Sequence, residues 1–189
     1  MPLKLAINVF LTILIMLSPS TALAFNKKST QFVDTIKLHG YIDGYGNVRV
    51  KNAKITELPD PLDVKGFLDI QGSDITRLPK ELKVAGYLNA SHSKLTRVPK
   101  VDVGGYMNLT GTKVTSLPRG LNVKGDLSLV NTPIKALPRK LNVEGNLYLA
   151  NTGITALPPD LRVGGNLYLR GTKIKTVPET VRVGGKVYR

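Results

Sequence analysis

Residues 161–178 read LRVGGNLYLRGTKIKTVP, and close variants of this segment recur through most of the chain. The clearest marker is a Leu-Pro or Val-Pro dipeptide, which occurs seven times at steps of 20 residues, with a single step of 19. A fixed short period is the signature of a solenoid, in which each repeat packs only on its neighbours. The marker prolines are Pro59, Pro79, Pro99, Pro118, Pro138, Pro158 and Pro178.

Apolar and polar residues alternate in the first part of each repeat. In residues 161–169, the apolar Leu161, Val163, Leu167 and Leu169 are separated by polar residues or glycine. A period of two is typical of a β-strand with one buried face. The sequence therefore predicts a repeat solenoid of parallel β-strands over residues 42–189, with one strand in each turn of about 20 residues. The main inward column contains Leu68, Leu88, Met107, Leu127, Leu147, Leu167 and Val187.

Three further columns predict how the turns are built. A glycine recurs within every strand pattern from Gly46 to Gly185 and predicts a corner or bulge where the coil bends. A column of Gly and Asn, with His92 in one place, follows the strand, and these residue types favour positive φ. A hydroxyl column from Ser73 to Thr172 comes next. Buried hydroxyl groups need hydrogen-bond partners, which we expect in adjacent turns.

Residues 147–158, LYLANTGITALP, carry the pattern L-x-L-x-x-[TN]-x-[IL]-x-x-L-P. This pattern resembles leucine-rich repeats, and in particular the short, proline-containing repeats of secreted bacterial proteins. The resemblance implies a parallel-strand solenoid and says little about function. The chain departs from the family where Ser or Thr replaces the usual ladder Asn, and where Lys124 or Glu144 replaces the first Leu. A β-solenoid outside the leucine-rich family is therefore the alternative. Some secreted relatives carry a ubiquitin-ligase domain with a catalytic cysteine, and this chain has no cysteine.

The first 24 residues lie outside the repeats and have the pattern of a signal peptide. Lys4 precedes a mostly apolar run at 5–17, and Ala22-Leu23-Ala24 forms a small-residue cleavage site. The run is shorter than the roughly 20 residues that span a bilayer. We expect residues 1–24 to be a cleaved signal peptide and 25–41 an N-terminal cap, with export to the periplasm or the outside of a bacterial cell. An uncleaved N-terminal anchor is the alternative.

The chain is strongly basic, with 27 Lys and Arg against 13 Asp and Glu and a net charge of +14. This excess favours acidic partners such as anionic envelope polymers, although it also keeps a repeat protein soluble. We predict that basic loop residues form a ridge beside the sheet over the central turns. These residues are Lys94, Arg97, Lys100, Lys113, Arg119, Lys135, Arg139 and Lys140.

Two outward columns of the strand pattern carry most of the aromatic residues. Successive strands lie about 4.8 Å apart, so residues 20 positions apart come into contact. Phe67, Tyr87 and Tyr106 are expected to form one aromatic run, and Tyr148, Tyr168 and Tyr188 another. Such runs stabilise a sheet, and with neighbouring amides they also suit glycan or peptide binding. The candidate binding residues of this face are Phe67, Tyr87, Tyr106, Asn146, Tyr148, Asn166, Tyr168 and Tyr188.

Residues suited to catalysis are scarce. The chain has two histidines, no cysteine and no glycine-rich phosphate loop that opens a helix. We expect no catalytic, metal or cofactor site, although a hydrolase built on a carboxylate pair is a third reading. The expected function is an exported, monomeric, non-enzymatic module that recognises a protein or glycan through its strand face. The alternative is an envelope-associated structural protein that its basic ridge holds to anionic polymers. Nucleic acid is the partner we expect least.

Overall fold

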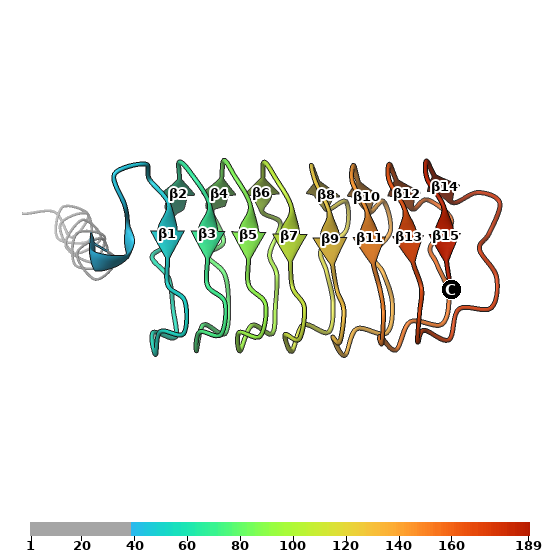
Figure 1. Cartoon of the computed structure of the whole chain (residues 1–189), viewed down its shortest axis with the longest axis horizontal. Coiled ribbons are helices and arrows are strands. Elements are labelled where there is room, and N and C mark those ends of the chain that lie inside the picture. The colour runs from blue at the N-terminus through green and yellow to red at the C-terminus, as the bar shows by residue number, and fades with distance from the viewer. Residues whose placement is uncertain (1–38) are drawn as a thin grey trace, which may run out of the picture.

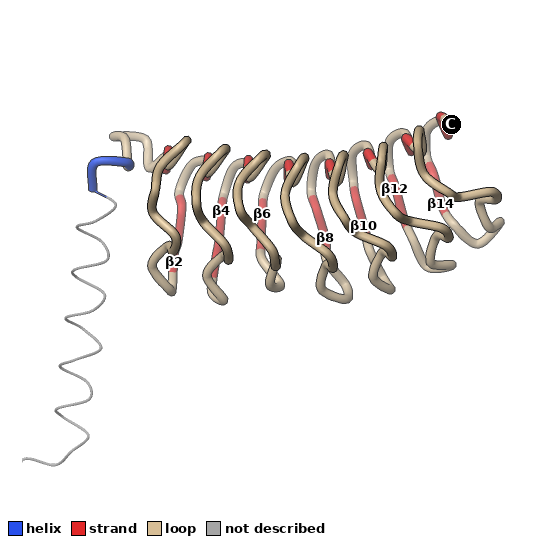
Figure 2. The backbone as a smooth tube through the Cα atoms, turned by 90° about the horizontal axis from the view of Figure 1, so that it is seen from below, coloured by secondary structure: helices blue, strands red, loops and turns tan. Residues whose placement is uncertain are grey.

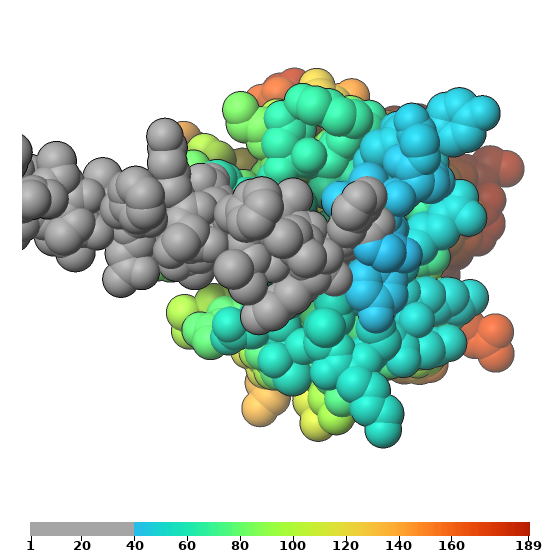
Figure 3. Space-filling model, turned by 90° about the vertical axis from the view of Figure 1, so that its left-hand side faces the viewer, coloured from blue at the N-terminus to red at the C-terminus, as the bar shows by residue number. Residues whose placement is uncertain are grey.

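The computed structural model describes residues 39–189, which form a parallel β-solenoid (Figure 1). Among these residues the only helix is the 3-10 helix η1 (His39–Tyr41). Each later turn of the chain stacks on the one before it (Figure 1), and in the end view the later turns lie behind the first (Figure 3). The predicted signal peptide, and most of the predicted cap at 25–41, lie outside the described residues.

Eight short strands form the front sheet, in which every neighbouring pair is parallel. Neighbouring residues are one repeat apart, as in the pairing of Leu147 with Leu167 and of Tyr148 with Tyr168. The fixed register brings each column of the sequence into a row along the solenoid. The strands are β1 (Val48–Arg49), β3 (Leu68–Asp69), β5 (Leu88–Asn89), β7 (Met107–Asn108), β9 (Leu127–Ser128), β11 (Leu147–Tyr148), β13 (Leu167–Tyr168) and β15 (Val187–Tyr188).

Seven further strands lie behind the front sheet and form two back sheets (Figures 1 and 2). The first back sheet contains β2 (Leu62–Val64), β4 (Leu82–Val84) and β6 (Asp102–Val103). The second contains β8 (Asn122–Val123), β10 (Asn142–Val143), β12 (Arg162–Val163) and β14 (Arg182–Val183). The parallel solenoid predicted from the repeat is therefore confirmed, but most turns contribute two short strands in place of one.

The corner between the two strands falls at the glycine column. A Cβ built on Gly165 would lie 2.6 Å from Asn146 Oδ1 and 3.0 Å from the Gly145 carbonyl, both in the preceding turn. Only glycine lets the turns approach this closely, because any side chain would have to displace its neighbour. The predicted corner is confirmed. The alternation of apolar and polar residues continues through it, which is why the pattern looks like one long strand.

The apolar columns face a single core that runs the length of the solenoid. Leu68, Leu88, Met107, Leu127, Leu147 and Leu167 of the main inward column are fully buried, whereas Val187 in the last turn is 39% exposed. The residues predicted to have positive φ adopt it, including His92 at 58° and Asn131 at 55°. His92 therefore occupies a turn position, as the sequence predicts.

The hydroxyl column bonds differently from the prediction. Thr132 Oγ1 donates a 2.7 Å hydrogen bond to the carbonyl of Leu129, in its own turn. The expectation of partners in adjacent turns is wrong, because the left-handed residue before each hydroxyl folds the chain back onto the carbonyl three residues earlier. The same bond is made by Ser73, Ser93, Thr112, Thr152 and Thr172.

The 19-residue step coincides with a break in the back surface. Only Lys100 connects Pro99 to Val101, whereas Arg119 and Gly120 connect the next pair. Within residues 39–189, β6 and β8 are not hydrogen-bonded to each other and belong to different sheets. Val101 stays buried. The missing residue thus leaves the core intact while the back surface is divided in two.

Candidate functional site

Two aromatic stacks stand on the outer surface of the front sheet. In the first, the ring centroids of Phe67 and Tyr87, and of Tyr87 and Tyr106, are 4.5 Å apart with nearly parallel planes. In the second, the centroid distances are 4.6 Å from Tyr148 to Tyr168 and 4.8 Å from Tyr168 to Tyr188. The predicted aromatic runs are confirmed. Offset or parallel contact of this kind stabilises a sheet by about 0.2–1 kcal/mol for each pair.

A polar ladder continues the column of the first stack. Asp126 Oδ1 accepts a 2.7 Å hydrogen bond from the backbone N–H of Asn146. Asn146 Oδ1 in turn accepts one of 2.8 Å from the N–H of Asn166, and Asn166 Oδ1 accepts one of 2.8 Å from the N–H of Lys186. Asn146 and Asn166 are two of the candidate binding residues. In this ladder their side-chain oxygens accept hydrogen bonds that hold the corner of the solenoid together.

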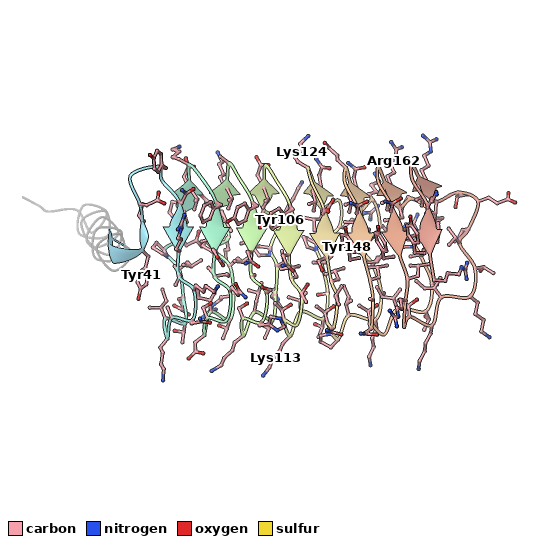
Figure 4. All side chains as sticks on the ribbon, in the orientation of Figure 1. Tyr41, Tyr106, Lys113, Lys124, Tyr148 and Arg162 are labelled. Atoms are coloured by element: carbon pink, nitrogen blue, oxygen red, sulfur yellow. The ribbon has the colours of Figure 1, made fainter. Side chains whose placement is uncertain are left out.

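The two stacks end near the middle of the front sheet, and a polar gap separates them. Tyr106 is the last ring of the first stack, and Asp126 follows it in the same column. Tyr148 is the first ring of the second stack, and Ser128 precedes it in the same column. We call the surface formed by Tyr106, Asp126, Ser128, Asn146 and Tyr148 the central patch. Figure 4 shows Tyr106 and Tyr148 on either side of it.

The central patch combines exposed aromatic surface with hydrogen-bonding groups. Tyr106 is 40% exposed, and Tyr148 and Asp126 are half-buried. The hydroxyl of Tyr148 lies 3.5 Å from Asp126 Oδ2. Burial raises the pKa of both Tyr106 and Tyr148 above the usual value for a phenol, and the charge of Asp126 adds to the effect at Tyr148. Both hydroxyl groups are therefore neutral hydrogen-bond donors at physiological pH.

The remaining aromatic candidates lie within or at the ends of the stacks. Tyr87 and Tyr168 are covered by a ring on each side. Phe67 lies under the guanidinium of Arg49, with the Cζ atom 4.9 Å from the ring centroid. Tyr188 is 43% exposed in the last strand. The ring faces most open to a ligand in the middle of the molecule are thus those of Tyr106 and Tyr148.

The basic candidates lie in more than one part of each turn. Lys94 and Lys113 directly follow the turn after the front strands, and Lys113 projects from the lower edge in Figure 4. Arg119 and Arg139 lie in the loops that lead to the back strands. Lys100 and Lys140 lie in the same loops as Arg119 and Arg139. Arg97 and Lys135 lie in the return segment, which is the part of each turn between Lys94 or Lys113 and those loops.

Two of these cations are also neutralised by neighbouring turns. Lys94 Nζ lies 2.9 Å from Asp74 Oδ1, and Arg139 Nε lies 2.8 Å from Asp160 Oδ2. The basic ridge therefore stays a prediction. Asp126 and Ser128 are the residues of the central patch that were not among the candidates predicted from the sequence. Their places in the two aromatic columns were the available signal.

The described part of the chain shows no arrangement suited to metal chemistry. No group of three or more His, Asp or Glu side chains in residues 39–189 is placed to hold a metal ion. No helix within these residues is long and apolar enough to cross a membrane. The central patch itself presents ring faces, a carboxylate and hydroxyl groups.

Comparison with known proteins identified no relative. Neither the family models, the curated proteins nor the solved structures gave a match to this chain. The parallel β-solenoid therefore rests on the structure itself, and the function has to be argued from the site.

Proposed function

We propose that the chain is an exported, non-enzymatic binding module that recognises a glycan or a protein through its front strand face, with a glycan as the favoured ligand. This proposal rests on one observation, which is that two aromatic stacks end in exposed rings on either side of a polar gap. Rigid rings with polar tips bind with little loss of conformational entropy. The carboxylate of Asp126 accepts hydrogen bonds from sugar hydroxyl groups, which supports a glycan over an apolar ligand.

The dimensions of the central patch support the same assignment. Tyr106 and Tyr148 belong to turns two strands apart, which corresponds to roughly 10 Å along the solenoid. A flat ring needs about 3.5–4 Å to each neighbouring ring face. The separation of the two tyrosines therefore leaves room for one sugar ring between them, beside the carboxylate of Asp126.

Calorimetric titration with neutral oligosaccharides such as cellohexaose and chitohexaose tests this proposal. Tyr106→Ala and Tyr148→Ala should each weaken binding about tenfold, the size expected for an aromatic anchor. Tyr45→Ala is the matched control, because Tyr45 is 87% exposed in the turn before β1 and lies outside both stacks. A loss of the same size in all three variants would contradict the proposal. Binding of peptides without any binding of saccharides would contradict the glycan and make a protein the ligand.

We also propose a distant relationship to the short leucine-rich repeats of secreted bacterial proteins. The fully buried Leu columns and the conserved spacing before Leu-Pro within this chain support it. The second candidate function is attachment to anionic polymer through a basic loop ridge. The ion pairs of Lys94 with Asp74 and of Arg139 with Asp160 reduce the free charge of that ridge.

A further inference from the structure

The outer surface of the back sheets changes character along the solenoid. In the first back sheet, Asp63 pairs in register with Lys83, and Lys83 with Asp102, so that the charges alternate in sign. In the second, Arg162 of β12 is directly opposite Arg182 of β14. Two guanidinium groups thus leave neighbouring strands about 4.8 Å apart. Like charges in this position repel each other and destabilise the pairing.

Neither arginine is neutralised within the described residues. Between residues 39 and 189, no carboxylate lies within 4.0 Å of the side-chain nitrogens of Arg162 or Arg182. Elsewhere on the same side of the molecule cations are paired, as Lys124 is with Glu144 at 2.9 Å. Both arginines are exposed. The pair is therefore a concentration of positive charge that an anion would relieve.

The two arginines line an open hollow of about 590 Å³. Lys140, Thr180 and Asn142 contribute to the same hollow, so that a third cation and two neutral hydrogen-bonding groups accompany the guanidinium groups. Lys140 has positive φ, 57°, in the loop before β10. The hollow lies on the second back sheet, whereas the central patch lies on the front sheet.

One carboxylate in the hollow is incompletely hydrogen-bonded. Asp160 lines the hollow, and its Oδ2 accepts the hydrogen bond from Arg139. Its Oδ1 is buried and makes no hydrogen bond of good geometry within the described chain. The hydrogen bond from Arg139 lowers the pKa of this carboxyl group, and the backbone N–H groups of Lys140 and Asp160 help to lower it, so the group is ionised at neutral pH and cannot donate. A buried acceptor of this kind is satisfied by a donor that a ligand or water brings.

We infer that this hollow is a binding site for a phosphorylated saccharide. The phosphate group accepts hydrogen bonds from the guanidinium groups of Arg162 and Arg182, whose planar forks match its oxygens. A hydroxyl group of the sugar donates to the carboxylate of Asp160, whose side chain lines the hollow and is 29% exposed. A phosphate monoester carries a charge of about −1.5 to −2 at pH 7, which suits a site with two arginines and a lysine better than a single carboxylate does.

Calorimetric titration of the full chain with glucose 6-phosphate, inorganic phosphate and glucose at low ionic strength tests this inference. Glucose 6-phosphate should bind more tightly than phosphate, and glucose should not bind at this site. Arg162→Gln and Arg182→Gln should each weaken glucose 6-phosphate binding by about tenfold or more, as expected for a charge-assisted hydrogen bond. Lys113→Gln removes the same charge from the opposite edge and should leave binding unchanged, which controls for net charge.

Asp160→Asn separates recognition of the sugar from recognition of the phosphate. The variant should lose the preference for glucose 6-phosphate over phosphate while it still binds both.

Vesicles of phosphatidylcholine with and without lipid A distinguish a membrane-held phosphosugar from a free one, since only a site open to the bilayer surface binds the lipid A vesicles. Absence of phosphate-dependent binding, or an equal loss in Lys113→Gln and Arg162→Gln, would overturn the inference. Neither result bears on Tyr106 and Tyr148.

Discussion

Asn146 Oδ1 accepts a 2.8 Å hydrogen bond from the backbone N–H of Asn166, exactly one repeat further along the chain. Within the strands, a backbone carbonyl accepts such a hydrogen bond. At the corner the side chain of Asn146 accepts it, because the backbone carbonyl there points in another direction. Asp126 and Asn166 make the same bond to the turns that follow them. The polar ladder is therefore part of the framework that carries the central patch.

Replacing Asn146 with Leu should destabilise the solenoid by about 1–3 kcal/mol, because the N–H of Asn166 is left without its partner. Asn146→Asp keeps the acceptor oxygen, as Asp126 does naturally, and should cost much less. Urea unfolding followed by circular dichroism measures both. Equal stability of the Leu and Asp variants would show that the ladder contributes nothing.

Gly165→Ala should destabilise by about 1–3 kcal/mol, the usual cost of overpacking. The new Cβ would lie 2.6 Å from Asn146 Oδ1. Gly153→Ala is the matched control, because its Cβ would meet nothing closer than 3.4 Å. The same denaturation measurement compares the two variants. If Gly153→Ala proved as harmful as Gly165→Ala, the cause would be lost backbone freedom and not the close approach at the corner.

Leu147→Asp should unfold several turns, since it places a charge in a fully buried position and every turn depends on its neighbours. Leu147→Met conserves volume and should cost less than about 1.5 kcal/mol. A soluble Asp variant with the circular dichroism spectrum of the parent would mean that the inward and outward faces have been assigned the wrong way round.

The tyrosines of the central patch should make stability fall in alkaline solution. The folded chain raises the pKa of Tyr106 and Tyr148, so it holds their protons more tightly than the unfolded chain does. Their contribution is present below the unfolded pKa of about 10 and is lost as pH rises through the higher folded values. The double variant Tyr106→Phe with Tyr148→Phe should show a smaller decrease in melting temperature between neutral and alkaline pH than Tyr45→Phe. An identical decrease would contradict the assignment.

The repeat sequence predicts most of the fold, because the columns report directly on burial and φ. Leu127 and Leu147 are fully buried and Asn131 has positive φ, as their columns indicate. The division of each strand at the glycine corner was not predictable from alternation, since the period of two continues across it. The direction of the Thr132 hydroxyl bond depends on the backbone trajectory after Asn131, which the residue types alone do not specify.

The aromatic part of the candidate site was predictable, because the register of the paired strands alone decides which side chains come into contact. Tyr148 and Tyr168 stack because they are one repeat apart on paired strands. Arg162 and Arg182 are likewise one repeat apart on paired strands, so the same register argument could have found this pair in the sequence.

The most direct test of the central claim is to map the saccharide on the protein by NMR. Isotope-labelled chain titrated with the tightest-binding oligosaccharide should show amide shift changes that cluster at Tyr106, Asp126 and Tyr148, with little change in the return segment at 133–138. Changes confined to that segment or spread evenly over the molecule would contradict recognition through the front strand face, as would a titration with every tested saccharide that leaves the spectrum unchanged.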